Sequence, residues 1–253
     1  MNALQELAHS LGFRAIESDW SRYKDEPWLV PLLEAEVAER DKRSMERRIK
    51  DGKLGHFKPM SEFDWSWPEE IDREQLEDLF TLKFIEEKAN VVLVGSNGIG
   101  KTMIAQNLAH QALMNGYKTR FVKASQMLAQ LQSCDGAAAR KRCFKRYCST
   151  DLLVIDEVGY LSYGTEYADL FYEVISERYQ RRSTVVTTNK VFKEWSEIFP
   201  HAACLVTLVD RLLHKAEVSL IKGRSYRTKE AEERAAEKAS QRKTKRTKRR
   251  NKS

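Results

Sequence analysis

A glycine-containing loop follows an apolar run and leads into a lysine and a threonine. Residues 90–102 read NVVLVGSNGIGKT, and the apolar run stops at Gly95. Glycines leave backbone N–H groups open to wrap a polyphosphate. Lys101 would place its charge on the β and γ phosphates, and the Thr102 hydroxyl suits a bound Mg²⁺. The spacing is that of a P-loop. It predicts a nucleotide site whose loop is formed by Gly95, Ser96, Asn97, Gly98, Ile99, Gly100, Lys101 and Thr102.

Two carboxylates end a second apolar run, LLVIDE, at residues 152–157. Four consecutive apolar residues suit a strand buried on both faces of a parallel sheet, and ligands of such sheets bind at the carboxyl ends of the strands. We expect Asp156 to hold Mg²⁺ through water. We expect Glu157 to orient and deprotonate the water that attacks the γ phosphate.

A third run, TVVTTN at residues 184–189, also ends in a polar residue. The order of the three runs along the chain would place the amide of Asn189 near the γ phosphate, where it can position the attacking water. Asn189 is therefore a third candidate catalytic residue.

The elements that must position these residues alternate between strand and helix. This alternation predicts an α/β fold, a P-loop NTPase with a five-stranded parallel sheet flanked by helices. Strands are expected at residues 91–94, 119–123, 152–157, 184–189 and 218–221. Helices are expected at residues 72–88, 101–115, 126–132, 137–148, 167–182 and 206–215.

The N-terminal part contains no nucleotide-binding feature and is expected to be a small all-helical domain. A long helix over residues 27–51 carries a dense basic run in its second half, which fits either a solvated face or contact with phosphates. The aromatic segment FDWSWP at residues 63–68 is expected to pack against a domain surface, and base stacking is the alternative.

The net charge of +7 is concentrated at the end of the 253-residue chain. Residues 238–253 contain nine Lys or Arg and no acid. This tail is expected to be disordered, and either nucleic-acid affinity or solubility would explain it. No apolar run has the length of a membrane span, so we expect a cytoplasmic protein without a membrane partner. The four cysteines lack metal-site spacing.

The three runs, together with ISERYQRRSTVVTTN, FKEW and VDRLLHKAEVSLIKGRSYR, resemble the IstB-like ATP-binding proteins. These are AAA+ accessory ATPases of insertion-sequence transposition, related to bacterial helicase loaders. The resemblance extends from about residue 40 to residue 227. Its most specific parts are VDRLLH and GRSYR.

The resemblance implies that ATP and Mg²⁺ are the cofactors and that the chain forms a homo-oligomer on duplex DNA. It also implies that the protein is cytoplasmic and DNA-associated in bacteria. There it would help the transposase of the same element select or capture target DNA, and ATP hydrolysis would reset the assembly. Arg211 of VDRLLH corresponds to the arginine finger that completes a neighbouring subunit's site. A helicase-loader-like adaptor, gripping a replication or recombination protein with ATP as a timer, is the alternative.

The chain departs from many relatives in its P-loop. Those relatives have two prolines and a threonine where this chain has Ser96, Asn97 and Ile99. It also ends soon after GRSYR, so no second sensor is expected in the usual place, and Arg224 and Arg227 are weak substitutes for it. We expect a helical domain for DNA or partner binding at residues 1–66, a linker and leading helix at 67–89, an AAA+ core at 90–228 and the basic tail at 229–253.

Overall fold

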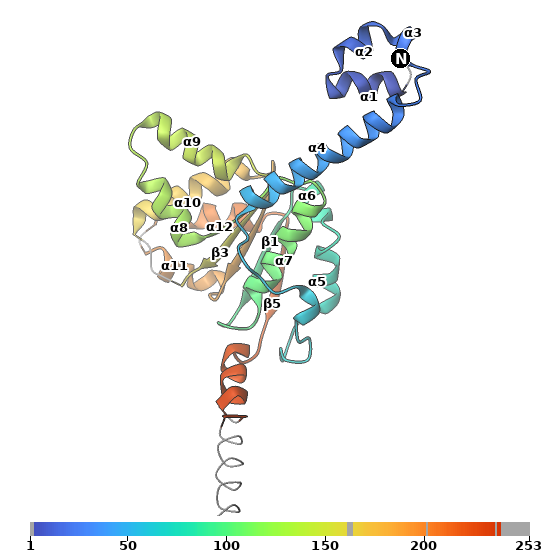
Figure 1. Ribbon diagram of the computed structural model, residues 1–253. Coiled ribbons are helices and arrows are strands. Elements are labelled where there is room, and N and C mark those ends of the chain that lie inside the picture. Colours follow the sequence, from blue (N-terminus) through green and yellow to red (C-terminus); the bar gives the residue numbers. More distant parts are fainter. Residues whose placement is uncertain (1–2, 161–163, 201, 236, 239–253) are drawn as a thin grey trace, which may run out of the picture. The chain divides into compact units, whose positions relative to one another are not determined.

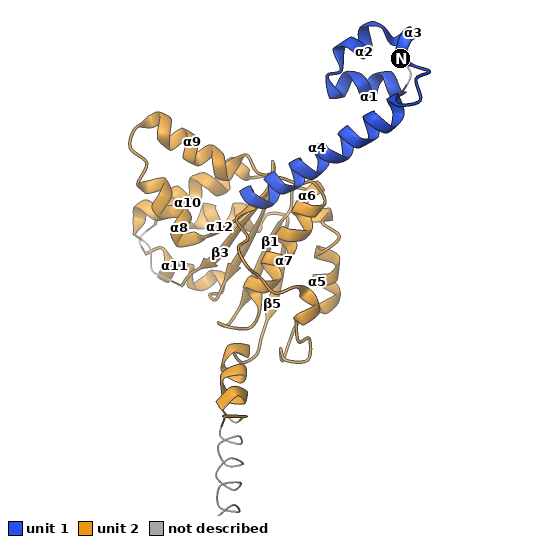
Figure 2. Cartoon of the chain, viewed as in Figure 1, with its two compact units in different colours: residues 1–51 blue, residues 52–253 orange. Residues whose placement is uncertain are grey.

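The chain forms two compact units in the computed structural model, residues 1–51 and residues 52–253 (Figure 2). The structure describes residues 3–160, 164–200, 202–235 and 237–238. Of the basic tail expected to be disordered at 229–253, residues 239–253 lie outside the described residues, whereas residues 229–235 are helical. Within the described ranges, none of the helices is both long and apolar enough to cross a membrane.

The first unit is helical, as expected. It contains α1 (Ala3–Leu11), α2 (Arg14–Ser18), α3 (Trp20–Tyr23) and all of α4 (Leu29–Gly52) except its last residue. Its small core consists of Ala8, Leu11, Ile16, Leu29 and Leu33. Two basic residues of α4 form ion pairs with glutamates one turn earlier on the same helix, Arg40 with Glu36 and Arg43 with Glu39. Part of the basic run is therefore neutralised within α4.

The second unit is built on a parallel sheet of five strands in the order β2-β3-β4-β1-β5 (Figure 1). The strands are β1 (Asn90–Gly95), β2 (Thr119–Lys123), β3 (Leu152–Val158), β4 (Ser183–Thr188) and β5 (Ala216–Ile221). All six residues of β1 and of β4 are buried, which explains their nearly continuous apolar and β-branched sequences. The predicted fold class is confirmed.

Helices cover both faces of this sheet. The sequence also forms α5 (Arg73–Leu79), α6 (Lys83–Glu86), α7 (Lys101–Met114), α8 (Ala124–Gln132), α9 (Ala137–Cys148), α10 (Thr165–Arg178), α11 (Trp195–Ile198) and α12 (Leu205–Leu213). Short 3-10 helices are η1 (Met60–Glu62) and η2 (Phe192–Glu194). Alternate residues of β1 belong to different cores: Val91 and Leu93 pack with α5, α6 and α7, whereas Val92 and Val94 pack with α8 to α12.

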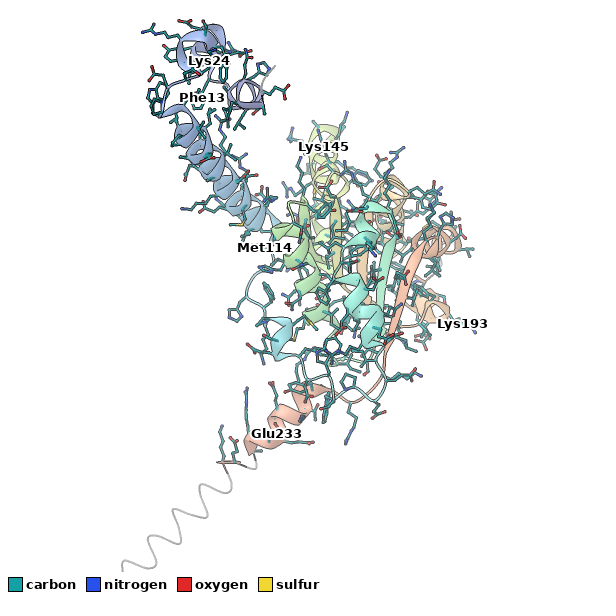
Figure 3. The ribbon with its side chains drawn as sticks, turned by 90° about the vertical axis from the view of Figure 1, so that its right-hand side faces the viewer. Phe13, Lys24, Met114, Lys145, Lys193 and Glu233 are labelled. Atoms are coloured by element: carbon teal, nitrogen blue, oxygen red, sulfur yellow. The ribbon has the colours of Figure 1, made fainter. Side chains whose placement is uncertain are left out.

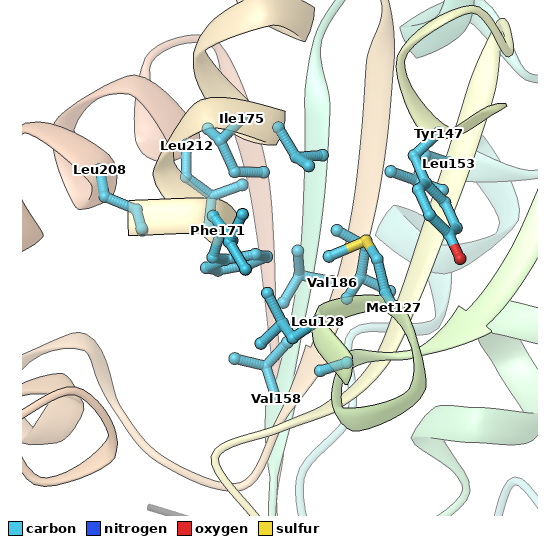
Figure 4. Close-up of a cluster of buried hydrophobic side chains, with 14 of the residues drawn as sticks. Met127, Leu128, Tyr147, Leu153, Val158, Phe171, Ile175, Val186, Leu208 and Leu212 are labelled. Atoms are coloured by element: carbon cyan, nitrogen blue, oxygen red, sulfur yellow. The ribbon is translucent and has the colours of Figure 1, made fainter. Parts of the chain in front are cut away.

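The core beneath α8 to α12 includes large side chains from several helices (Figure 4). Phe171 of α10 stacks on Phe199 with ring centroids 5.7 Å apart, and Leu208 and Leu212 of α12 pack into the same cluster. This packing attaches α12 to the body of the unit.

The region before β1 differs from the single helix expected at residues 72–88. The chain forms two short helices, because Leu82 adopts a left-handed conformation with φ of 64° and buries its side chain in the core. Residues 52–66, assigned from the sequence to the helical N-terminal domain, belong to the second compact unit, where Phe57, Met60 and Phe63 pack against its core.

Candidate active site

The loop between β1 and α7 packs closely against Phe63 and Ser225, which is possible because the loop contains glycines. Gly98 and Gly100 have φ of 78° and 109°, values that L side chains rarely adopt. A Cβ on Gly100 would lie 2.5 Å from the Phe63 ring, and one on Gly98 would meet the Ser225 side chain. The glycines therefore serve the protein's own packing as well as the open backbone that a phosphate needs.

The Lys101 ammonium lies inside this loop. Its Nζ donates to the carbonyl oxygens of Gly95 and Ser96, at 2.7 and 2.8 Å, and the residue is only 3% exposed. Burial lowers the pKa of Lys101 to about 8, although the nearby Asp156 opposes this shift. The site thus holds a desolvated cation that an anionic ligand would stabilise.

Asp156 is fully buried where β3 approaches α7. The Thr102 hydroxyl donates to both carboxylate oxygens, at 3.0 and 3.2 Å, and the Thr187 hydroxyl donates to Oδ1 at 2.5 Å. Burial raises the pKa of Asp156, and the two hydroxyl contacts counteract it. A hydroxyl and a carboxylate held side by side are the oxygen ligands that Mg²⁺ prefers, so this donor set fits the expected ion.

Glu157 follows directly, in a left-handed conformation with φ of 62°. Its backbone N–H donates to the Thr187 hydroxyl at 2.9 Å, and its carboxylate pairs with the Lys123 ammonium at 2.8 Å. Non-glycine residues in this conformation cost about 1–3 kcal/mol and cluster at functional sites. The turn directs Glu157 to the cavity beside the P-loop, whereas Asp156 stays buried.

Asn189 follows the end of β4. Its side-chain Oδ1 is buried and has no hydrogen-bond partner among the described residues. This oxygen would lie 3.1 Å from a Cβ on Gly159, the glycine that follows β3. Asn189 does not line the main cavity itself, but it offers an unused acceptor close to the strand that carries both acids.

The cavity beside the P-loop has a volume of about 500 Å³. Its lining includes most of the predicted loop and Glu157, together with residues from the segments before α5 and after β5. The aromatic segment at 63–68 packs against the second unit: Phe63 and Trp65 are partly buried against the core beneath α7, and Trp67 Nε1 donates to the Arg224 carbonyl at 2.8 Å.

The GRSYR segment also lines the cavity, through Tyr226 and Arg227. From the sequence, Arg224 and Arg227 of this segment were considered only as weak substitutes for a second sensor. The Tyr226 N–H donates to the Gly98 carbonyl, and the Ser96 hydroxyl donates to the Gly223 carbonyl, both at 2.9 Å. Arg227 also lines the cavity, and its charge contributes to the lowered pKa of Lys101. GRSYR is one of the motifs most specific to the family, and this was the only sign in the sequence that the segment has a role at the site. The sequence does not show that the segment contacts the P-loop.

Arg211 lies outside this cavity. It is on α12, and its guanidinium lies over the rings of Tyr172 and Tyr179 from α10, at 5.1 and 5.8 Å from their centroids. The described chain therefore brings the P-loop, Asp156 and Glu157 together but does not bring Arg211 to them.

The fold and the site define a nucleotide-binding P-loop fold of the AAA+ type. Among solved structures the chain is similar to DnaI, with a TM-score of 0.53 and 16% identity over 68% of this chain and 90% of that one. It is also similar to the DnaC helicase loader, with a TM-score of 0.51 and 17% identity over 68% and 97%. These likenesses concern the fold.

The chain belongs to the IstB-like ATP binding protein family, whose model matches residues 1–234. It is 33% identical over 236 residues to an insertion sequence IS5376 ATP-binding protein of Geobacillus stearothermophilus, covering 90% of this chain and 94% of that protein. It is 36% identical over 202 residues to the IS232 ATP-binding protein of Bacillus thuringiensis subsp. berliner, covering 80% and 81%. The IS21 protein of Pseudomonas aeruginosa is 34% identical over 203 residues, covering 80% and 77%. The resemblance found in the sequence is confirmed.

Proposed function

We propose that the protein hydrolyses ATP with Mg²⁺ at a site that a second copy completes, and that this cycle serves transposition on duplex DNA. The observation that carries the proposal is that Arg211 is separated from the other predicted site residues. Lys101, Thr102 and Glu157 line one cavity, and Asp156 is buried directly behind it against Thr102, whereas Arg211 lies outside the cavity, over the Tyr172 ring. An arginine that acts on transferred phosphate in such proteins can come from a neighbouring subunit.

The chain's own residues supply the rest of the chemistry. Lys101 and the loop amides bind the phosphates, and Thr102 and Asp156 would hold Mg²⁺, which would supply positive charge to offset that of the phosphates. Glu157 accepts a proton from the attacking water, and Asn189 orients that water. The oxygen of the water bonds to the γ phosphorus, and ADP leaves with the electrons of the broken P–O bond.

The role in transposition is supported by the relatives, which are named as ATP-binding proteins of insertion sequences. DNA binding is supported by the surface charge of α9, where Lys145 is labelled in Figure 3. This helix exposes Arg140, Lys141, Arg142, Lys145 and Arg146. Arg140 pairs with Glu173 at 3.5 Å, and exposed cations such as the other four can neutralise a duplex backbone. We propose that the DNA-bound oligomer helps a transposase select or capture target DNA.

The test is the ATPase rate per subunit, measured over a range of protein concentrations with and without duplex DNA. The rate should rise with concentration and with DNA, and Arg211→Ala should lower the stimulated rate by roughly 10³–10⁵ while ATP still binds. Arg181→Ala is the matched control, because Arg181 is an exposed arginine paired with Glu177 at 2.9 Å. A rate per subunit that is the same at every concentration, or a normal rate for Arg211→Ala, would refute the proposal.

A further inference from the structure

Two cysteines lie together where α8 ends and α9 begins. Cys134 is a partly buried residue of the connection between these helices, and Cys143 is a buried residue of α9. Both are free thiols. Both donate to the same acceptor, the backbone carbonyl oxygen of Gln130, which lies 3.0 Å from the Cys134 sulfur and 3.8 Å from the Cys143 sulfur. The chain therefore holds two thiols around one oxygen atom.

The two thiols also interact with each other. Burial raises the pKa of the Cys143 thiol, and a hydrogen bond with Cys134 raises it further. The guanidinium groups of Arg146 and Arg120 act in the opposite direction, because a nearby positive charge favours the thiolate. Cys134 is more exposed than Cys143, so a dissolved reagent reaches its sulfur first. The pair thus consists of an accessible outer thiol and a shielded inner thiol.

The connection that carries Cys134 has room to move toward Cys143. A disulfide requires the two sulfur atoms to approach to about 2.0 Å. Residues 133–136 belong to neither helix, and a Cβ on Gly136 would meet nothing within 4 Å among the described residues apart from its chain neighbours. Cys143 is held more firmly, because the Tyr147 hydroxyl of α9 donates to the Gln130 side chain of α8 at 2.5 Å. The outer thiol can therefore move while the inner thiol stays in place.

We propose that Cys134 and Cys143 form a reversible redox site, which hydrogen peroxide oxidises to a disulfide. The Cys134 sulfur attacks one peroxide oxygen, the O–O bond breaks, and the released hydroxide takes the thiol proton and leaves as water. The Cys143 sulfur then attacks the sulfenic acid on Cys134. The S–S bond forms as the S–O bond breaks, and the hydroxide leaves with the Cys143 proton as a second water. A small dithiol reverses the reaction by thiol–disulfide exchange.

The disulfide would restrain α9, the helix that exposes a row of cations. It would close a ring of residues 134–143, which contains Arg140, Lys141 and Arg142. Closing a short ring removes conformational freedom from the segment inside it. The inference goes beyond the proposed function, because neither ATP nor DNA takes part in the reaction. Its tests therefore stand even if the proposed function fails.

The first test identifies the linked cysteines by mass spectrometry of the full chain. The protein is treated with hydrogen peroxide, the remaining thiols are blocked with N-ethylmaleimide after denaturation, and the chain is digested with trypsin. Trypsin cleaves at the basic residues between the two cysteines, so Cys134 and Cys143 fall in separate peptides, residues 124–140 and 143–145. We expect one species that contains both peptides, lacks two hydrogens and separates on addition of dithiothreitol. N-ethylmaleimide on both cysteines after peroxide treatment, or a disulfide from either to another cysteine or another chain, would overturn the inference.

The second test separates the roles of the two thiols. In Cys143→Ala the sulfenic acid on Cys134 has no thiol to attack it, so it should persist and react with dimedone. In Cys134→Ser the linked species should be absent. Because Cys134 lies outside the helices, this variant keeps the test valid if replacing the buried Cys143 disturbs folding. Cys204→Ser is the matched control, because Cys204 is also partly buried, and it should form the linked species as the wild type does. A Cys143→Ala chain that gains no dimedone on Cys134, or a Cys204→Ser chain that no longer forms the linked species, would contradict the assignment.

Discussion

Because the Lys101 ammonium is buried, we expect ATP affinity to depend on pH between pH 7 and pH 9. A lysine with an ordinary pKa would not cause such a dependence in this range. With a pKa of about 8, the ammonium is charged in roughly nine-tenths of free molecules at pH 7 and in roughly one-tenth at pH 9. A bound triphosphate favours the charged form of Lys101. Only the molecules in which Lys101 is already charged therefore bind ATP without first taking up a proton. ATP affinity should therefore weaken about tenfold between pH 7 and pH 9, or about 1.4 kcal/mol. A lysine at its usual pKa would lose only a few per cent of its charge over this range.

Titration calorimetry in buffers of different ionisation enthalpy measures both the affinity and the proton uptake. At pH 8 the wild type should take up about half a proton for each ATP bound. Lys101→Arg is the control, because a guanidinium stays charged throughout and removes this uptake. An affinity that changes less than twofold between pH 7 and pH 9, without proton uptake, would refute the reasoning about the buried lysine.

Two further predictions concern Glu157 and the Thr187 hydroxyl, which forms hydrogen bonds with Asp156 and with the Glu157 backbone. Glu157→Gln should bind ATP, fail to hydrolyse it and accumulate on DNA in a binding assay with ATP, because the amide cannot accept the proton; rapid turnover would exclude Glu157 as the base. Thr187→Val should lower the ATPase rate about tenfold or more and the free energy of unfolding by about 1–3 kcal/mol, because it leaves the Glu157 N–H unpaired and removes a donor to Asp156. Thr187→Ser keeps the hydroxyl and should retain most of the rate and stability in the same kinetic and urea-unfolding measurements. Equal losses in both variants would show that the methyl group matters instead.

The parts of the site that follow local rules could be predicted from the sequence. The P-loop is one continuous stretch, and the buried strand before Asp156 has a recognisable apolar pattern, so both were placed correctly at the carboxyl edge of the sheet. The contacts of Lys123 and Thr187 could not be predicted in this way. They depend on β3 lying between β2 and β4, and that strand order is not contained in any single segment.

The break at Leu82 was missed for a related reason. The periodicity of residues 72–88 is helical, but burial of Leu82 in the core compensates for a left-handed backbone that local propensity disfavours. The return of GRSYR to the P-loop is likewise a contact between distant segments. The roles of Asn189 and Arg211 come from the order of motifs and from the resemblance, and they stay predictions.

The central claim is that one copy supplies Glu157 and another supplies Arg211 to the same site. Mixing Glu157→Gln with Arg211→Ala, each inactive alone, tests it most directly through the DNA-stimulated ATPase rate. In a random equal mixture, a site is complete when its own chain keeps Glu157 and the neighbour keeps Arg211, so about one-quarter of the wild-type rate should return. If Arg211 acted within its own chain, every site would still lack one residue. The mixture would then be no more active than its two components, and that result would contradict the account.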